Sequence, residues 1–76
     1  MTGIRPIHYK RFERFLLRVG CHFVRQEGDH KVYTRPGLFR PVIVRTKKDL
    51  PIMKIKSNLR TLGITTEEYL RIIETV

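Results

Sequence analysis

The sequence predicts an α+β fold in which helices cover one face of a small three-stranded antiparallel sheet. Two observations predict it: apolar residues recur with helical spacing near both ends of the chain, and short β-like segments separated by turn residues fill the middle. The predicted order is helix, three strands, two helices, which packs as an α+β sandwich. A chain of 76 residues cannot divide its small core in two, so we expect residues 1–76 to form one domain.

The first helix is predicted over residues 6–19, because its apolar residues follow the i, i+3, i+4, i+7 spacing: Phe12, Phe15, Leu16 and Val19. Gly20 comes next and can adopt the left-handed conformation that ends a helix. After it the helical period is lost, and we expect the first strand over residues 21–26.

A hairpin is predicted from the turn signal Glu27-Gly28-Asp29, which separates the first strand from a second at residues 31–35. The stretch Arg35-Pro36-Gly37 then interrupts the chain, and Pro41 precedes a third strand at residues 42–44. The three strands are expected to form a meander.

Two helices are predicted to complete the fold. Asp49 is expected to cap the first of them and Pro51 to occupy its first turn, followed by one apolar stripe and by Gly63: Ile52, Ile55, Leu59 and Leu62. Thr65 and Glu68 have the spacing of a capping box, which predicts a last helix with its own stripe: Tyr69, Ile72, Ile73 and Val76.

The chain is strongly basic, with 16 Lys and Arg against 7 Asp and Glu and a formal charge of +9. Residues 1–63 carry +11 and residues 64–76 carry −2. This charge predicts a polyanionic partner, first of all a nucleic acid, although acidic proteins and anionic lipid surfaces also fit it.

The cysteine and aspartate content excludes several classes of site. Cys21 has no second cysteine for a disulfide or a thiolate zinc cluster, and we expect it to be a small buried side chain in a cytoplasmic protein. Asp29 and Asp49 are the only aspartates and belong to no ligand cluster, so no metal or cofactor is expected. No apolar run approaches the roughly 20 residues that span a bilayer, which predicts no membrane insertion.

The chain resembles the HicA family of toxins from toxin–antitoxin modules over nearly its whole length. The resemblance rests on the order and spacing of residues 12–20 and 23–26, the turn Gly28-Asp29-His30 with Tyr33, residues 40–44 and residues 56–64. It implies a fold similar to the double-stranded RNA-binding domain, a ribonuclease activity on mRNA, and inhibition by a partner antitoxin called HicB. The family's activity depends on the histidine after the turn, here His30. Many members have Ser in place of Asp29 and Pro in place of Arg45.

The chemistry expected of His30 is proton transfer during attack of an RNA 2′-hydroxyl on the adjacent phosphate, a reaction for which an imidazole is suited. A structural role in the turn is the alternative. If the second strand is regular, Lys31, Tyr33 and Arg35 share an outward face and Val32 and Thr34 face the core. His30 then catalyses only if it lies in the turn or at a frayed strand end.

The RNA contacts are expected from basic and aromatic side chains. Lys31, Arg35 and Arg45 are predicted to hold phosphate, and Tyr33 to stack on an unpaired base. Lys54 and Lys56 are predicted to add phosphate contacts from the second helix, with a merely solvated helix face as the alternative. The loop pair Lys47-Lys48 is interpreted as a solubility feature.

Three hypotheses follow. The first is a metal-independent endoribonuclease toxin that is monomeric alone and binds mRNA and a HicB-like antitoxin. The second is a non-catalytic RNA-binding module of the same fold, and the third is an inactive toxin whose basic surface mainly binds an acidic protein partner.

Overall fold

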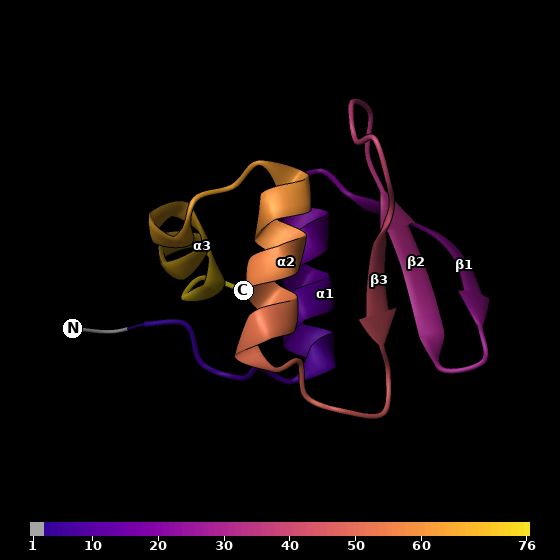
Figure 1. The fold of residues 1–76 in the computed structure, drawn as a ribbon, viewed down its shortest axis with the longest axis horizontal. Coiled ribbons are helices and arrows are strands. Elements are labelled where there is room, and N and C mark those ends of the chain that lie inside the picture. The colour runs from indigo at the N-terminus through magenta and orange to yellow at the C-terminus, as the bar shows by residue number, and fades with distance from the viewer. Residues whose placement is uncertain (1–2) are drawn as a thin grey trace.

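The computed structural model describes residues 3–76 and contains three helices and one three-stranded sheet within that range. The elements are α1 (Tyr9–Arg18), β1 (His22–Glu27), β2 (His30–Thr34), β3 (Val42–Arg45), α2 (Ile52–Leu62) and α3 (Thr66–Ile73). All three helices lie on the same side of the sheet (Figure 1). The predicted α+β class and element order are therefore confirmed.

The sheet is an antiparallel meander with strand order β1-β2-β3. Glu27 pairs with His30, so the first hairpin turns on two residues, and Gly28 supplies the left-handed φ of 61° that the turn requires. His30 pairs in turn with Arg45 on β3. The beginning of β2 and the end of β3 thus lie side by side.

The prediction of which β2 side chains face the core is wrong. Lys31 and Tyr33 point toward α1, because Tyr33 is only 5% exposed and its cross-strand partner Val42 belongs to the core. The Glu13 carboxylate of α1 explains the orientation, since it accepts a hydrogen bond from the Tyr33 hydroxyl at 2.9 Å and pairs with the Lys31 ammonium at 3.1 Å. His30 therefore lies on the helix-free face through ordinary strand alternation, and needs no irregular position.

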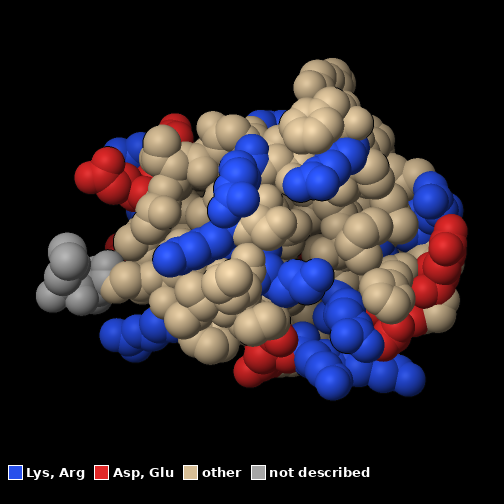
Figure 2. Space-filling view, viewed as in Figure 1, with Lys and Arg blue, Asp and Glu red and all other residues tan. Residues whose placement is uncertain are grey.

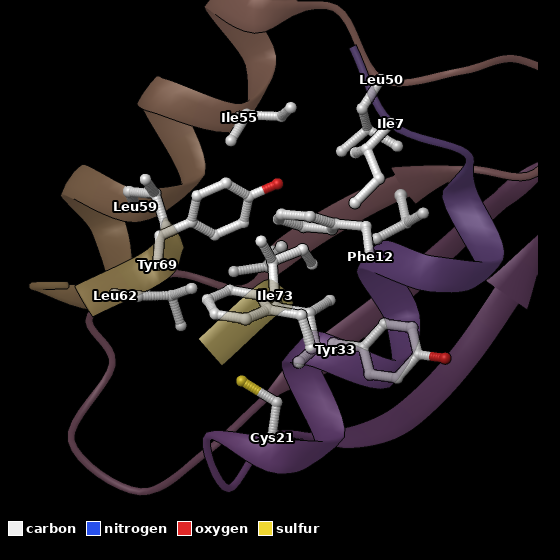
Figure 3. Packing of buried hydrophobic residues seen from close by; sticks show 14 of the residues in the cluster. Ile7, Phe12, Cys21, Tyr33, Leu50, Ile55, Leu59, Leu62, Tyr69 and Ile73 are labelled. Atoms are coloured by element: carbon white, nitrogen blue, oxygen red, sulfur yellow. The ribbon is translucent and has the colours of Figure 1, made fainter. Parts of the chain in front are cut away.

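The core lies between the helices and this inner face of the sheet (Figure 3). Phe12, Phe15 and Leu16 are fully buried as the helical spacing predicts, and Tyr69 of α3 packs edge-on against Phe15 with ring centroids 4.9 Å apart. Cys21 is buried in the same cluster, as expected.

The start of α2 differs from the prediction. The N-cap residue is Pro51 and no side chain caps this end, so Asp49 remains in the preceding loop. Ile52 is 37% exposed because it belongs to the first turn, whereas the Ile55, Leu59 and Leu62 side chains are buried. Gly63 ends the helix with a φ of 71°, and the capping box of Thr65 and Glu68 begins α3, both as predicted.

Candidate functional site

A hollow of about 560 Å³ lies where the β1–β2 turn and the β3–α2 loop meet. Figure 1 shows both connections at the same end of the sheet, next to the beginning of α2. His30 and Arg45 reach this end because they are paired across β2 and β3. The hollow is lined by eight residues: His30, Ile43, Arg45, Lys48, Asp49, Leu50, Pro51 and Lys54.

His30 is held by the residue that precedes it. Its Nδ1 lies 3.0 Å from Oδ1 of Asp29, and its side chain remains 47% exposed. The Asp29 carbonyl accepts hydrogen bonds from the backbone N–H and the hydroxyl of Thr46, at 2.8 and 3.3 Å, so the turn is fastened to the end of β3. A carboxylate beside Nδ1 favours a proton on that nitrogen, which leaves the lone pair of Nε2 free to accept another.

Three cations from three consecutive elements surround the hollow. Arg45 ends β3 and places one guanidinium nitrogen 3.8 Å from Oδ2 of Asp29. Lys48 belongs to the following loop and Lys54 to the first turns of α2. Together they make the hollow a favourable place for the negative charge of a phosphate.

The remaining wall is apolar except for Asp49. Ile43, Leu50 and Pro51 form it, and Ile43 is 42% exposed on the helix-free face of the sheet. The loop is fixed in place because Leu50 and Ile7 exchange backbone hydrogen bonds of 2.7 and 3.1 Å. The hollow therefore combines a rigid apolar wall with a basic rim.

Of the predicted RNA-binding residues, the structure brings only Arg45 and Lys54 beside His30. Lys31 and Tyr33 lie on the opposite face of the sheet, engaged with Glu13. Burial, reinforced by the hydrogen bond to Glu13 and by its negative charge, raises the pKa of Tyr33 well above its ordinary value. The buried Tyr33 ring is not available to stack on an RNA base.

Arg35 and Lys56 also lie elsewhere. The Arg35 guanidinium donates to the carbonyls of Val19 and Leu62, at 2.5 and 2.7 Å, and so satisfies the C-terminal ends of α1 and α2. Lys56 lines a separate hollow of about 370 Å³ at the junction of α2 and α3, together with Arg60.

Lys48 is the site residue that the sequence interpretation missed. The sequence interpretation places Lys48 in a solubility pair with Lys47, yet Lys48 lines the hollow that contains His30. Strand pairing is the signal that finds it, because whatever follows the end of β3 must lie near the beginning of β2.

Basic side chains gather over α2 and continue toward the end of the sheet that carries the hollow, as Figure 2 shows. Acidic side chains are fewer on this face. Within residues 3–76, no three His, Cys, Asp or Glu side chains are close enough to hold a metal ion. No helix in this part of the chain is long and apolar enough to cross a membrane.

Comparison with protein-family models identifies the family of this chain. The family model of the HicA toxin of bacterial toxin–antitoxin systems matches residues 9–64, from the first residue of α1 to just beyond the end of α2. A search of curated proteins finds no match. The family match includes the whole sheet, His30 and every residue that lines the hollow. Because it covers well over half of the 76 residues, the chain belongs to the HicA family of toxins.

Proposed function

We propose that this toxin is a metal-independent endoribonuclease that cleaves mRNA, with His30 as the group that transfers the proton. The observation that carries the proposal is the setting of His30: an exposed imidazole, anchored at Nδ1 by Asp29, in a hollow with a basic rim. Cleavage of RNA by its own 2′-hydroxyl requires a proton acceptor beside groups that bind phosphate, and the hollow provides both.

The proposed reaction begins when Nε2 of His30 takes the proton of the 2′-hydroxyl. The 2′ oxygen then bonds to the adjacent phosphorus and the bond from phosphorus to the 5′ oxygen breaks. The 5′ oxygen takes up a proton from water, and the His30 imidazolium returns its proton to the solvent. The products are a 2′,3′-cyclic phosphate and a 5′-hydroxyl. Asp29 stabilises the imidazolium that forms, because its carboxylate lies 3.0 Å from Nδ1.

The rim cations stabilise the negative charge that builds up on the phosphoryl oxygens in the transition state. Arg45, Lys48 and Lys54 line the same hollow as His30, so a phosphate beside Nε2 lies within the field of all three. Arg45 is also close to Asp29, at 3.8 Å, and helps to keep that carboxylate in position for the imidazole.

Membership in a toxin–antitoxin family implies an antitoxin partner. We propose a HicB-like protein that is acidic where it meets the basic surface, since residues 1–63 carry +11 and complementary charge accelerates and orients association. The toxin is proposed to act in the cytoplasm as a monomer when it is free of its partner.

The test compares wild type, His30→Ala and a matched control, His22→Ala, on unstructured RNA in EDTA. His22 is an exposed histidine at the opposite end of the sheet, where it pairs with Thr34. We expect wild type and His22→Ala to produce fragments ending in 2′,3′-cyclic phosphate, and His30→Ala to produce none while showing the same circular dichroism spectrum.

Two results would contradict the proposal. Cleavage by folded His30→Ala at the wild-type rate would remove His30 from the reaction. RNA binding without cleavage by any of the three proteins would favour a non-catalytic RNA-binding module or an inactive toxin of this fold.

A further inference from the structure

The hollow beside His30 has more apolar wall than a phosphate site needs. Ile43, Leu50 and Pro51 contribute apolar surface, and its volume of about 560 Å³ falls within the roughly 300–1,000 Å³ of small-ligand pockets. Ile43 keeps 42% of its surface exposed although it stands among cations. Apolar surface left uncovered within a basic rim indicates a ligand that has both a charged and an apolar part.

Asp49 gives a second reason to look beyond phosphate. Asp49 lines the hollow together with Leu50 and Pro51, and its negative charge disfavours a phosphate on that side. The three cations stand on β3, on the loop and on α2, so they frame the apolar wall. The phosphates of a bound strand therefore fit the rim, and an uncharged group fits the interior.

We propose that the hollow receives one unpaired nucleobase of the RNA, which packs against Ile43 and Pro51 while the neighbouring phosphates contact Arg45, Lys48 and Lys54. This inference takes RNA as the ligand from the proposed function. It assigns the base contact to a different part of the molecule from Tyr33, which is buried. A base paired and stacked within a duplex cannot enter such a hollow, so the toxin acts on single-stranded segments.

The experiment measures binding without cleavage. Short RNA strands whose 2′-hydroxyls are all methylated cannot be cut, because the attacking group is blocked. Fluorescence anisotropy compares an intact strand, the same strand with abasic sites, and the intact strand annealed to its complement. We expect roughly tenfold weaker binding when the bases are absent, which corresponds to about 1.4 kcal/mol. Binding to the duplex is expected to weaken to a similar degree.

A matched pair of variants locates the contact. Ile43→Thr keeps a β-branched residue in β3 but removes apolar surface from the hollow, whereas Val24→Thr makes a comparable change on β1 outside the hollow. Val24 is 44% exposed, close to the 42% of Ile43. Ile43→Thr should lower affinity for the intact strand about threefold to fivefold and leave affinity for the abasic strand unchanged, since about 1 kcal/mol is a factor of five. Val24→Thr should change neither, and thermal unfolding shows that both variants fold.

The outcomes separate this inference from the nuclease proposal. Equal affinity for intact and abasic strands, duplex binding as tight as single-strand binding, or equal effects of the two variants would each overturn the base site. So would a failure to bind any strand, which would leave a segment of the antitoxin as the better occupant. Base-dependent binding with no cleavage of unmodified RNA would keep the base site and refute the nuclease.

Discussion

Replacing Tyr33 by Phe removes one hydroxyl from the interior and keeps the aromatic ring. In the native protein this hydroxyl donates to the Glu13 carboxylate at 2.9 Å, from a residue that is almost wholly buried. A hydrogen bond to a charged group contributes about 1.5–3 kcal/mol. Glu13 keeps its ion pair with Lys31 at 3.1 Å, so its charge is not left without a partner. We therefore expect the free energy of unfolding to fall by about 2 kcal/mol.

Urea denaturation followed by circular dichroism measures this difference. The slope of the unfolding free energy against urea concentration should be the same for both proteins. The difference also depends on pH. Because the folded protein raises the pKa of Tyr33, it favours the neutral phenol, and the unfolded chain loses that proton first. The advantage of wild type over Tyr33→Phe is therefore complete below about pH 10, the ordinary pKa of tyrosine, and shrinks as the pH rises further.

Cleavage of RNA per mole of folded protein should be the same for Tyr33→Phe and wild type. A fall in unfolding free energy of less than about 0.5 kcal/mol would refute the role assigned to the Glu13 hydrogen bond. If Tyr33→Phe bound RNA more weakly than wild type with the same free energy of unfolding, Tyr33 would belong to the RNA-binding surface, which would contradict its burial.

Three further changes test the site and the fold. Asp29→Ala should slow single-turnover cleavage roughly tenfold by removing the group that orients the imidazole, and Asp29→Asn should fall between Ala and wild type, because it keeps an oxygen but loses the charge. Lys48→Ala should raise the KM for RNA about fivefold, equivalent to about 1 kcal/mol of charge interaction, whereas the adjacent Lys47→Ala should change it less than about twofold; equal effects would place Lys48 outside the site. Thr65→Ala should lower the free energy of unfolding by about 1 kcal/mol in urea at neutral pH. The backbone N–H of Thr65 and, to a smaller extent, its hydroxyl donate to the Glu68 carboxylate and lower the pKa of Glu68. Thr65→Ala removes only the hydroxyl, so the part of the loss that comes from this bond should be present above the ordinary carboxyl pKa and diminish as the pH falls below it, whereas the bond from the Glu68 N–H to the Thr65 hydroxyl oxygen does not depend on pH. An unfolding free energy equal to that of wild type would contradict the capping box.

The local features of the fold were predictable from the sequence because neighbouring residues determine them. Helical spacing identified the buried face of α1, and the Thr65 and Glu68 pair identified the beginning of α3. Gly28 marked the hairpin turn, which the structure reduces to two residues. These signals act within four or five positions along the chain.

The orientation of β2 was not predictable in this way. Lys31-Val32-Tyr33-Thr34 alternates between two kinds of side chain, and either set fits a half-buried strand. Glu13 of α1, about 20 positions earlier, determines which set faces the helices. Its carboxylate binds both the Lys31 ammonium and the Tyr33 hydroxyl between α1 and the sheet. A buried carboxylate needs such partners, and the sequence alone does not show which ones it finds.

The candidate site was predictable in part, since the sequence analysis names His30, Arg45 and Lys54, which all line the hollow. His30 follows a recognisable turn, but its neighbours Lys48 and Asp49 come together with it through the pairing of β2 with β3 and through the backbone bridge between Leu50 and Ile7. That bridge joins positions 43 residues apart and fixes the loop that forms one wall of the hollow. No spacing rule along the chain connects them.

Some of the basic side chains stabilise the fold and others surround the hollow beside His30. The net charge alone does not show which side chain does which. Arg11 and Arg35 donate to backbone carbonyls at the C-terminal ends of helices, and Lys31 neutralises Glu13. These cations stabilise the fold, although their field still attracts a polyanion over a distance of a Debye length. Contact with phosphate beside His30 depends instead on the three rim cations of the hollow. Long-range attraction therefore follows the net charge of the chain, +9, whereas the number of phosphates held at the site follows the geometry of β3, its loop and α2.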